Sequence, residues 1–248
     1  MKAIITDLDR TLLRTDKSVS LFTKDVLYKC KQRGLKVIAA TARPQRDLNK
    51  VVGDIAFDAM VLSNGARVVC GSEITEFAIL SESAVRLLRI LSSYPDFRIT
   101  LETGHCAYSN VSFEDYESVV RQDLVTVAEQ ESVLKIIVGI DRDDVIDIVK
   151  KELTDDLYYT VSCGQLLQIM SKQATKWNGV KSVLCCYNIS PWEAVYFGDD
   201  NDDIEPIKNC GLGVAVSNAI PSVLDAADQI ADSNDKDGVA KFIAENIL

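Results

Sequence analysis

The sequence contains few of the groups on which several kinds of catalysis depend. Its 248 residues include a single histidine, His105, which follows Gly104 and is expected in an exposed loop. A histidine nucleophile or a Ser-His-Asp triad would need this one residue, yet it lies in a middle segment away from the acidic strand ends described below. We therefore expect neither kind of catalysis.

Positive charge is also scarce. Lysine and arginine number 27 against 37 aspartate and glutamate residues, which gives a net charge of −10. Such a field repels nucleic acid and anionic lipid, so we expect no nucleic-acid partner and no membrane partner. A small phosphorylated metabolite could still bind where a metal or local cations offset the field.

Long apolar runs are missing as well. The chain has no stretch of about 18 apolar residues, the length that a membrane-spanning helix requires. Its first residues form an apolar strand that ends in acids, which does not resemble an export signal. We expect a soluble, cytoplasmic protein, and the sequence leaves its oligomeric state open.

The cysteines show no metal-binding or redox spacing. They are odd in number and scattered, without a Cys-x-x-Cys pair, so reduced thiols serving as small core residues are the expectation. The seven positions are Cys30, Cys70, Cys106, Cys163, Cys185, Cys186 and Cys210.

The order of apolar patterns predicts an α/β protein with an insertion. Residues 3–6, 20–33 and 35–40 read as strand, helix and strand, with Ser20 capping the helix, and this order makes a parallel βαβ unit. A short helix is expected to start at Pro44, and a third strand spans 59–62. Antiparallel strands mixed with helices follow, and the parallel pattern resumes near residue 174. We predict a Rossmann-like parallel-sheet core of residues 1–81 and 172–248, interrupted by an α+β domain of residues 82–171.

Two carboxylates follow the first strand directly. Asp7 and Asp9 lie two residues apart, so on an extended chain both side chains point to one side. Their repulsion is tolerable only with a cation or a shared proton. Such a pair taken alone is more often a turn or a helix cap, but a second acidic cluster at residues 199–203 favours a functional site.

Reactive side chains also follow the other predicted strands. Ligands of open parallel sheets bind at the carboxyl ends of the strands, and carboxylates from two strands suit Mg²⁺ better than zinc. Thr41 could instead cap the helix at Pro44, and Asn64 could be only a turn former before Gly65. The residues at these strand ends are Thr11, Thr41, Arg43, Ser63, Asn64 and the cluster Asp199 to Asp203.

Four segments of the chain resemble, in the correct order, the motifs of one enzyme superfamily. DLDRTLL is similar to the Asp-x-Asp-x-Thr motif of the haloacid dehalogenase superfamily, AATARP to its second motif and FGDDNDDIEPI to its fourth, with Lys176 as the candidate for the third. LSNGA, GLGVAVSNA and SNDKDGVAKFI further resemble the Cof-type small-molecule phosphatases. The resemblance implies that the inserted domain is a substrate-selecting cap.

The resemblance also implies roles for individual residues. Asp7 would be the nucleophile and Asp9 the general acid and base, while the Asp7 side chain, the Asp9 backbone carbonyl and Asp199 would hold Mg²⁺. Thr41 and Lys176 would bind the phosphoryl oxygens. Lys172 lies four residues earlier and either lysine could be an exposed helix residue, but the spacing of the superfamily's motifs favours Lys176. The remaining assignments are substrate or phosphate binding for Arg43, Asn64 and Asp202, and support of the site for Asp203 and Thr11.

Some positions depart from the superfamily's pattern. Arg10 stands where the Cof-type proteins usually have glycine, Ala42 and Trp177 also replace glycines, and Asp202 occupies a position that usually holds asparagine. These changes make the loops bulkier without removing a catalytic group. Asp202 could bind either metal or substrate.

The expected function is Mg²⁺-dependent hydrolysis of phosphate monoesters of small metabolites, with sugar phosphates as the best guess, through an aspartyl-phosphate. Two alternatives remain: a phosphomutase of the same superfamily, and a non-catalytic phospho-aspartate signalling module. The charged run at residues 232–237 is expected to be a solvated loop.

Overall fold

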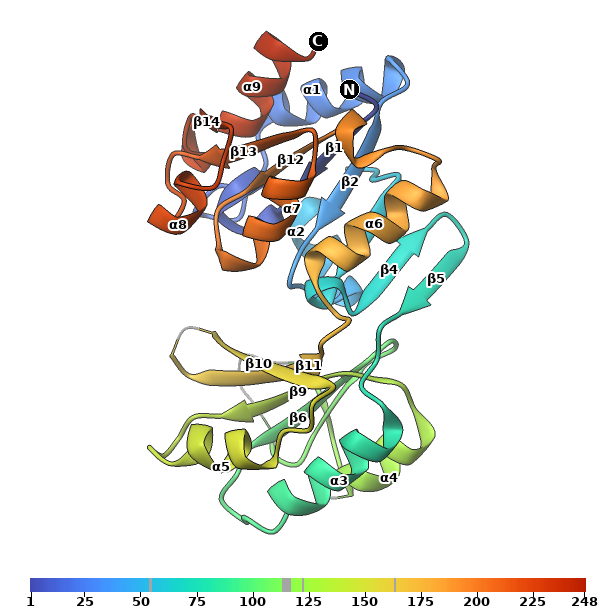
Figure 1. The fold of residues 1–248 in the computed structure, drawn as a ribbon, viewed down its shortest axis with the longest axis vertical. Helices are drawn as coiled ribbons and strands as arrows, with labels where there is room; N and C mark the ends of the chain where they lie inside the picture. Colours follow the sequence, from blue (N-terminus) through green and yellow to red (C-terminus); the bar gives the residue numbers. More distant parts are fainter. Residues whose placement is uncertain (54, 113–116, 122, 163) are drawn as a thin grey trace. The chain divides into compact units, whose positions relative to one another are not determined.

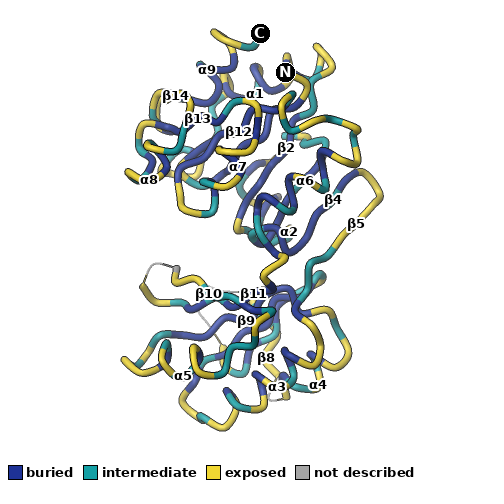
Figure 2. The backbone as a smooth tube through the Cα atoms, viewed as in Figure 1, coloured by how far each residue is buried: buried dark blue, intermediate teal, exposed yellow. Residues whose placement is uncertain are grey.

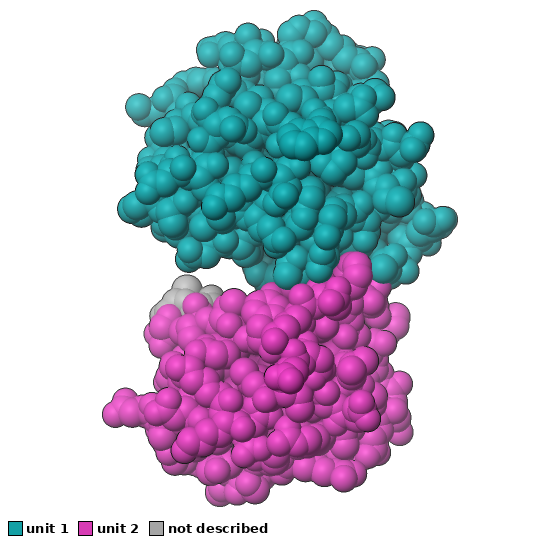
Figure 3. Space-filling view, viewed as in Figure 1, with its two compact units in different colours: residues 1–75, 175–248 teal, residues 76–174 magenta. Residues whose placement is uncertain are grey.

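The computed structural model describes residues 1–53, 55–112, 117–121, 123–162 and 164–248. The chain forms two compact units, coloured separately in Figure 3: Met1–Thr75 with Thr175–Leu248 is unit 1, and Glu76–Ala174 is unit 2. These units begin and end a few residues from the predicted boundaries at 82 and 171. Cys163, at the predicted interruption of a hairpin, lies outside the described residues.

Unit 1 is built on an eight-stranded sheet. Strand β1, labelled between β12 and β2 in Figure 1, pairs in parallel with both of these strands, whereas β3 and β4 pair antiparallel. The prediction of a parallel α/β core is therefore confirmed. In spatial order the strands are β14 (Gln229–Ala231), β13 (Leu212–Val216), β12 (Ala194–Gly198), β1 (Ala3–Thr6), β2 (Lys36–Ala40), β3 (Ala59–Leu62), β4 (Arg67–Cys70) and β5 (Glu73–Glu76).

The central strands of this sheet are buried on both faces. All four residues of β1 are buried, and β12 and β13 are dark along most of their length in Figure 2. Burial on both faces is why these strands read as continuous apolar runs rather than alternating ones. The sheet therefore offers a rigid base for the residues that follow its strand ends.

Helices pack around the sheet of unit 1. Ser20 caps α1, since its hydroxyl accepts a bond of 3.0 Å from the Thr23 amide, and α1 packs against α9. Helix α2 starts one residue later than predicted, because Pro44 is the N-cap and not the first helical residue. The helices are α1 (Leu21–Gln32), α2 (Gln45–Val52), α6 (Lys176–Cys186), α7 (Ile204–Asn209), α8 (Pro221–Leu224) and α9 (Gly238–Asn246).

Unit 2 has a second, smaller sheet with helices. Its strands are antiparallel except for the β7–β8 pair, and their order is β10 (Leu157–Ser162), β11 (Leu166–Ser171), β9 (Val133–Gly139), β6 (Ile99–Thr103), β7 (Ala107–Ser109) and β8 (Val119–Val120). The helices are α3 (Ser81–Leu91), α4 (Leu124–Gln130) and α5 (Val145–Glu152). This arrangement confirms the inserted α+β domain.

The core of unit 2 lies between its helices and its sheet. Leu87, Leu88 and Leu91 of α3 are fully buried and belong to one apolar cluster with Ile136 and Val138 of β9. The spacing of the three leucines places them on one side of the helix. Among the described residues of the whole chain, no helix combines the length and apolar character that crossing a membrane requires.

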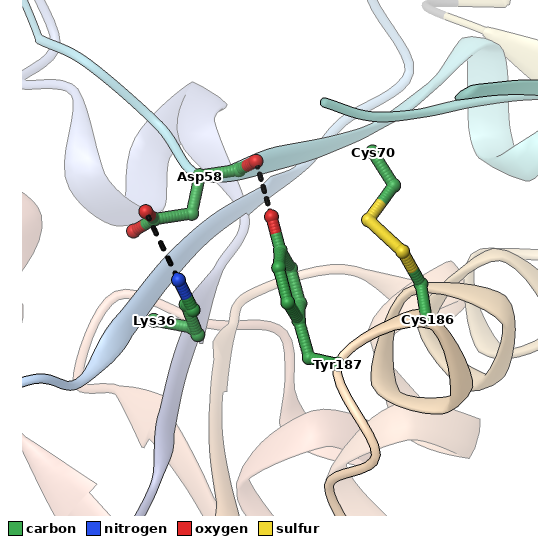
Figure 4. The surroundings of a disulfide bond; sticks show 5 residues. All are labelled: Lys36, Asp58, Cys70, Cys186 and Tyr187. Carbon is green, nitrogen blue, oxygen red and sulfur yellow. Dashed lines mark hydrogen bonds and ion pairs between the residues drawn. A yellow bond between two sulfur atoms is a disulfide. The ribbon is translucent and has the colours of Figure 1, made fainter. Parts of the chain in front are cut away.

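Two cysteines of unit 1 form a disulfide, which corrects the expectation of reduced thiols throughout. Cys70 ends β4 and Cys186 ends α6, and Figure 4 shows their sulfur atoms joined. The reason is the antiparallel return of β4, which was not predicted and which brings the chain beside α6. Next to the bond, the Tyr187 hydroxyl donates to the backbone carbonyl of Asp58 over 2.7 Å.

Candidate active site

The candidate site lies where the order of the parallel strands reverses. From β1 the chain proceeds through β2 and β3 on one side, and after the insertion it continues through β12, β13 and β14 on the other. Asp7 directly follows β1 and Asp199 directly follows β12. Ligands of open α/β sheets bind at such a reversal, beyond the carboxyl ends of the strands.

Lys176 lies at the centre of the site. As the first residue of α6 it follows Thr175, whose hydroxyl caps the helix by accepting from the Asn178 amide. The buried Lys176 ammonium donates to Asp7 over 2.8 Å and to Asp203 over 2.7 Å. The surrounding aspartates raise the pKa of Lys176 well above its usual value although burial opposes them, so the lysine keeps its charge. Lys172, the alternative candidate, precedes this helix.

A glycine allows the helix to approach the end of β3. Gly65 has a φ of +94°, and a side-chain carbon there would lie 2.0 Å from the Thr175 carbonyl oxygen. Only glycine tolerates both this backbone conformation and this contact. The turn after β3 is therefore part of what places Lys176.

Asp203 is held by four hydrogen-bond donors. One oxygen accepts from Lys176 and, over 2.6 Å, from the Tyr196 hydroxyl; the other accepts from the amides of Asp199 and Asp200 over 3.0 and 3.1 Å. The side chain is completely buried. With both oxygens engaged, Asp203 is suited to fixing the loop that carries Asp199.

Asp7, Asp199 and Asp203 together form a buried acidic cluster. One carboxylate oxygen from each lies within 4.8 Å of the others. Burial is the main cause that raises the pKa of Asp7 well above 3.8 and that of Asp199 to about 6; Lys176 acts in the opposite direction on both. Because Asp203 is engaged by its donors, Asp7 and Asp199 are the carboxylates best placed to take a cation. An all-oxygen set of this kind fits Mg²⁺.

The Thr11 hydroxyl donates to Asp199 over 2.7 Å and so orients that carboxylate. This contact spans two strand ends, since Thr11 belongs to the loop after β1 and Asp199 follows β12. The supporting role of Thr11 stays a prediction, and this hydrogen bond is the contact through which it would act.

Asp9 faces two cations. The Arg43 guanidinium donates two hydrogen bonds of 2.6 and 2.7 Å to the Asp9 carboxylate, and the Lys17 ammonium donates a third of 2.8 Å. Burial would raise the pKa of Asp9, but these hydrogen bonds outweigh it, so the pKa is lowered and the carboxylate is ionised. Arg43, predicted to contact substrate, is thus bound to Asp9 in this structure. Nothing in the sequence pattern pointed to Lys17.

The remaining predicted residues lie at the ends of β2 and β3. The Thr41 hydroxyl accepts from the Arg43 amide over 3.2 Å and does not cap α2, so that alternative is wrong. Asn64 adopts a left-handed turn with φ 59° and also donates to Asp202 over 2.8 Å, so it is more than a turn former. Asp202 in turn lies 3.3 Å from the Lys176 ammonium.

The acidic run near the C-terminus is largely exposed, as predicted, but it also makes contacts that were not predicted. Asp232, Asp235 and Lys236 are exposed, while Asp235 accepts from Thr15 and Asp237 from Arg14 in the loop after the first motif. Tyr196 was also missed as a site residue, because inside an apolar strand it reads only as core. The partners of Asp235 and Asp237 lie 220 and 223 residues away in sequence, whereas Tyr196 contacts Asp203, which lies seven residues further along, beyond the end of β12.

Fold and site together define an α/β enzyme with a carboxylate-rich site at its strand reversal. The chain belongs to the haloacid dehalogenase-like hydrolases, whose family model matches residues 4–243.

Individual relatives are similar to this chain over nearly the full length of both proteins. YxeH of Bacillus subtilis is 28% identical over 270 residues, covering 100% of this chain and 98% of YxeH. YitU of the same organism, a 5-amino-6-(5-phospho-D-ribitylamino)uracil phosphatase, is 25% identical over 98% of this chain and 96% of its own. The solved structure of the subclass IIB sugar phosphatase BT4131 has a TM-score of 0.80 at 21% identity, with 98% of both chains covered. The predictions of a Cof-type member with an inserted cap, and of a phosphatase, are confirmed.

Proposed function

We propose that the protein hydrolyses phosphate monoesters of sugars and related polyhydroxylated metabolites, with Mg²⁺, through an aspartyl-phosphate on Asp7. The observation that carries the proposal is the buried Asp7 carboxylate, which accepts a hydrogen bond from Lys176 and lies beside Asp199 in a cluster with more carboxylates than cations. The names of YitU and BT4131 support the substrate class, since a ribityl phosphate and a sugar phosphate both carry phosphate on a polyol chain.

In the first half of the proposed reaction an oxygen of Asp7 attacks phosphorus. The bond from phosphorus to the alkoxide leaving group breaks, and Asp9 gives that oxygen a proton. Because Arg43 and Lys17 keep Asp9 ionised in this structure, the proposal requires that both cations turn away from Asp9, toward the substrate, before Asp9 takes up this proton. In the second half Asp9, now ionised, takes a proton from water, which attacks phosphorus and releases Asp7 and inorganic phosphate. Asp9 then carries the proton needed for the next cycle.

The proposed metal ligands are the carboxylates of Asp7 and Asp199 and the backbone carbonyl of Asp9. When bound, Mg²⁺ offsets the repulsion between an anionic nucleophile and an anionic phosphate. Lys176 and Thr41 hydrogen-bond the phosphoryl oxygens, and Arg43 and Asn64 contact the rest of the substrate. Asp203 and Thr11 hold Asp199 in place, as their bonds suggest.

We assign substrate selection to the inserted unit, residues 76–174, as the cap of this superfamily. Exchange of this unit for that of a relative with another substrate tests the assignment. The substrate preference should follow the exchanged unit, while hydrolysis of a small aryl phosphate should change little. A preference that stays with the core would contradict it.

The decisive experiment is a screen of phosphorylated metabolites that measures released inorganic phosphate with Mg²⁺ present. Sugar phosphates should be hydrolysed fastest. A phosphomutase would move phosphate to another hydroxyl without releasing it, and a signalling module would not turn over an aryl phosphate repeatedly. Absence of phosphate release from every ester would overturn the proposal.

A further inference from the structure

The backbone that follows Asp9 has a conformation that its own residues do not favour. Arg10 has a φ of 61°, in the left-handed region that side chains with a β-carbon disfavour. A residue persists in this region when its surroundings hold it there. The question is therefore what holds the segment Arg10 to Leu13, which connects the Asp9 loop to the rest of unit 1.

Two asparagines near the C-terminus hold this segment at both ends. Asn218 donates its side-chain amide to the Arg10 carbonyl over 2.8 Å, and Asn234 donates to the Leu13 carbonyl over 3.1 Å. The two are joined, because the Asn234 backbone amide donates to the Asn218 side-chain oxygen over 2.9 Å. We call these two residues the asparagine clamp. Both lie in the phrases GLGVAVSNA and SNDKDGVAKFI, for which the sequence suggested no role.

The contacts around the asparagine clamp argue against a role for Asn234 in binding a ligand. Asn234 is buried, so its amide is not available to solvent or to a ligand. Beyond Leu13, Arg14 and Thr15 are bound by Asp237 and Asp235, which anchor the outer part of the loop. The clamp is thus the part of this network nearest to Asp9.

We propose that Asn218 and Asn234 are positioning residues that fix the backbone after Asp9, and through it the Asp9 carbonyl and carboxylate relative to Asp7. The proposal rests on the roles of Asp7 and Asp9 given above. Loss of the bond to the Arg10 carbonyl lets Arg10 leave its left-handed conformation, which turns the adjoining peptide and moves Asp9. The chemical step then slows more than substrate binding weakens, because proton transfer depends on the position of Asp9.

The test uses Asn218→Asp, which keeps the oxygen that accepts from Asn234 and removes only the donor to Arg10. Asn209→Asp is the matched control, since Asn209 makes the same type of bond to a backbone carbonyl, that of Glu205, within α7. We expect kcat for a sugar phosphate to fall about 10- to 100-fold in Asn218→Asp, which is at or below the lower limit for complete loss of acid–base catalysis, because Asp9 is displaced and not removed. KM and the thermal midpoint should change little, and the control should keep kcat within about twofold of wild type.

Glycine at position 10 provides a second, independent readout. Because glycine adopts a φ of 61° without cost, Arg10→Gly combined with Asn218→Asp should restore part of the lost kcat. A purely structural role for Asn218 would not respond in this way. Equal kcat losses in Asn218→Asp and the control, or no recovery with glycine, would overturn the proposal.

A third readout does not depend on activity. Hydrogen exchange of the metal-free protein should be faster across residues 9–15 in Asn218→Asp than in wild type or in the Asn209→Asp control. Unchanged exchange there would also overturn the proposal. If wild type released no phosphate at all, the proposed function would fail, and exchange would still decide whether the clamp holds the loop.

Discussion

Both units bury charged side chains, but the ratio of buried cations to buried carboxylates differs between the two sites compared. On the sheet of unit 2, Glu102 of β6 lies directly opposite Lys135 of β9, both are almost completely buried, and Lys135 also donates to Gln168 over 2.8 Å. In unit 1 the ammonium of Lys176 faces Asp7 and Asp203 at hydrogen-bond distance, with Asp199 close by. One buried cation there meets several carboxylates.

This difference helps to distinguish buried charges that only stabilise the fold from buried charges that serve a functional site. A buried pair of opposite charges satisfies itself and needs no further partner. An excess of one sign in a buried site lowers stability unless a ligand or metal supplies the missing charge. The imbalance in unit 1, more than the burial itself, supports the proposal that its strand ends bind a cation and a phosphate.

The largest effects should come from separating Asp7 and Asp9, which look alike in sequence. Asp7→Asn removes the proposed nucleophile, so we expect hydrolysis to fall by about 10⁴-fold or more. Asp9→Asn keeps the nucleophile but removes the proton carrier, so a substrate with a good leaving group should phosphorylate Asp7 and the adduct should persist. Mass spectrometry should locate that adduct on Asp7. An adduct on Asp9 in the Asp7→Asn protein would mean that the two roles are exchanged.

Metal removal should have the next largest effect. A chelator should abolish hydrolysis, and added Mg²⁺ should restore it, because the acidic cluster without a cation repels phosphate. Mg²⁺ should also raise the thermal midpoint of wild type but not that of Asp199→Ala. Asp232→Ala, which changes an exposed acid, is the control and should respond as wild type does. Full activity after rigorous chelation would contradict the metal assignment.

In unit 2 the same kind of substitution should act on stability alone. Glu102→Gln removes the buried negative charge that lies opposite Lys135 on the sheet, which should lower the free energy of unfolding by roughly 1–3 kcal/mol. The chemistry on an aryl phosphate should persist in protein that remains folded. Replacing both residues, as Glu102→Gln with Lys135→Met, should recover much of the loss in urea unfolding. No recovery would mean that this pair is not balanced as described.

The smallest effect concerns the pH dependence of stability. Burial above all raises the pKa of Asp199 from 3.8 to about 6 in the folded protein. Between these values the folded state holds a proton that the unfolded chain has lost, so this contribution to stability is complete below about pH 4 and disappears as pH rises through about 6. At pH 7 the metal-free protein therefore carries a charged carboxylate that costs on the order of 2–3 kcal/mol.

Asp199→Asn removes that cost while keeping an oxygen for the Thr11 hydroxyl. The metal-free variant should be more stable than wild type at pH 7, and the difference should shrink as the pH falls toward 4. Urea unfolding with a chelator at several pH values measures this. A difference that does not vary with pH would show that titration of Asp199 is not its cause.

The sequence was most informative where the signal is local. The apolar run of β1, the Ser20 cap and the placement of Asp7 after a strand each depend on a few consecutive residues. The register of β1 with β2, in which Thr6 lies opposite Ala39, then brings Arg43 near Asp9. This proximity follows from strand adjacency, but the bidentate ion pair depends on side-chain conformation that no sequence pattern reports.

What could not be predicted depends on contacts between distant segments. The β4–β5 strands lengthen the sheet with an antiparallel edge that the preceding βαβ pattern gave no reason to expect. Asn234 was assigned to a solvated loop because its composition is polar, whereas the fold buries it against Leu13. Composition predicts only that polar residues are usually exposed, whereas a contact with a distant segment can bury an individual polar residue such as Asn234.

The disulfide gives the chain an unusual covalent topology. Cys70 and Cys186 lie on either side of the insertion, so the bond closes a ring that contains every residue of unit 2, with residues 1–69 and 187–248 as two tails. A single protease cut within the insertion would open this ring without dividing the molecule. The nicked protein would run as one species on a denaturing gel until a thiol reductant separates it into two fragments.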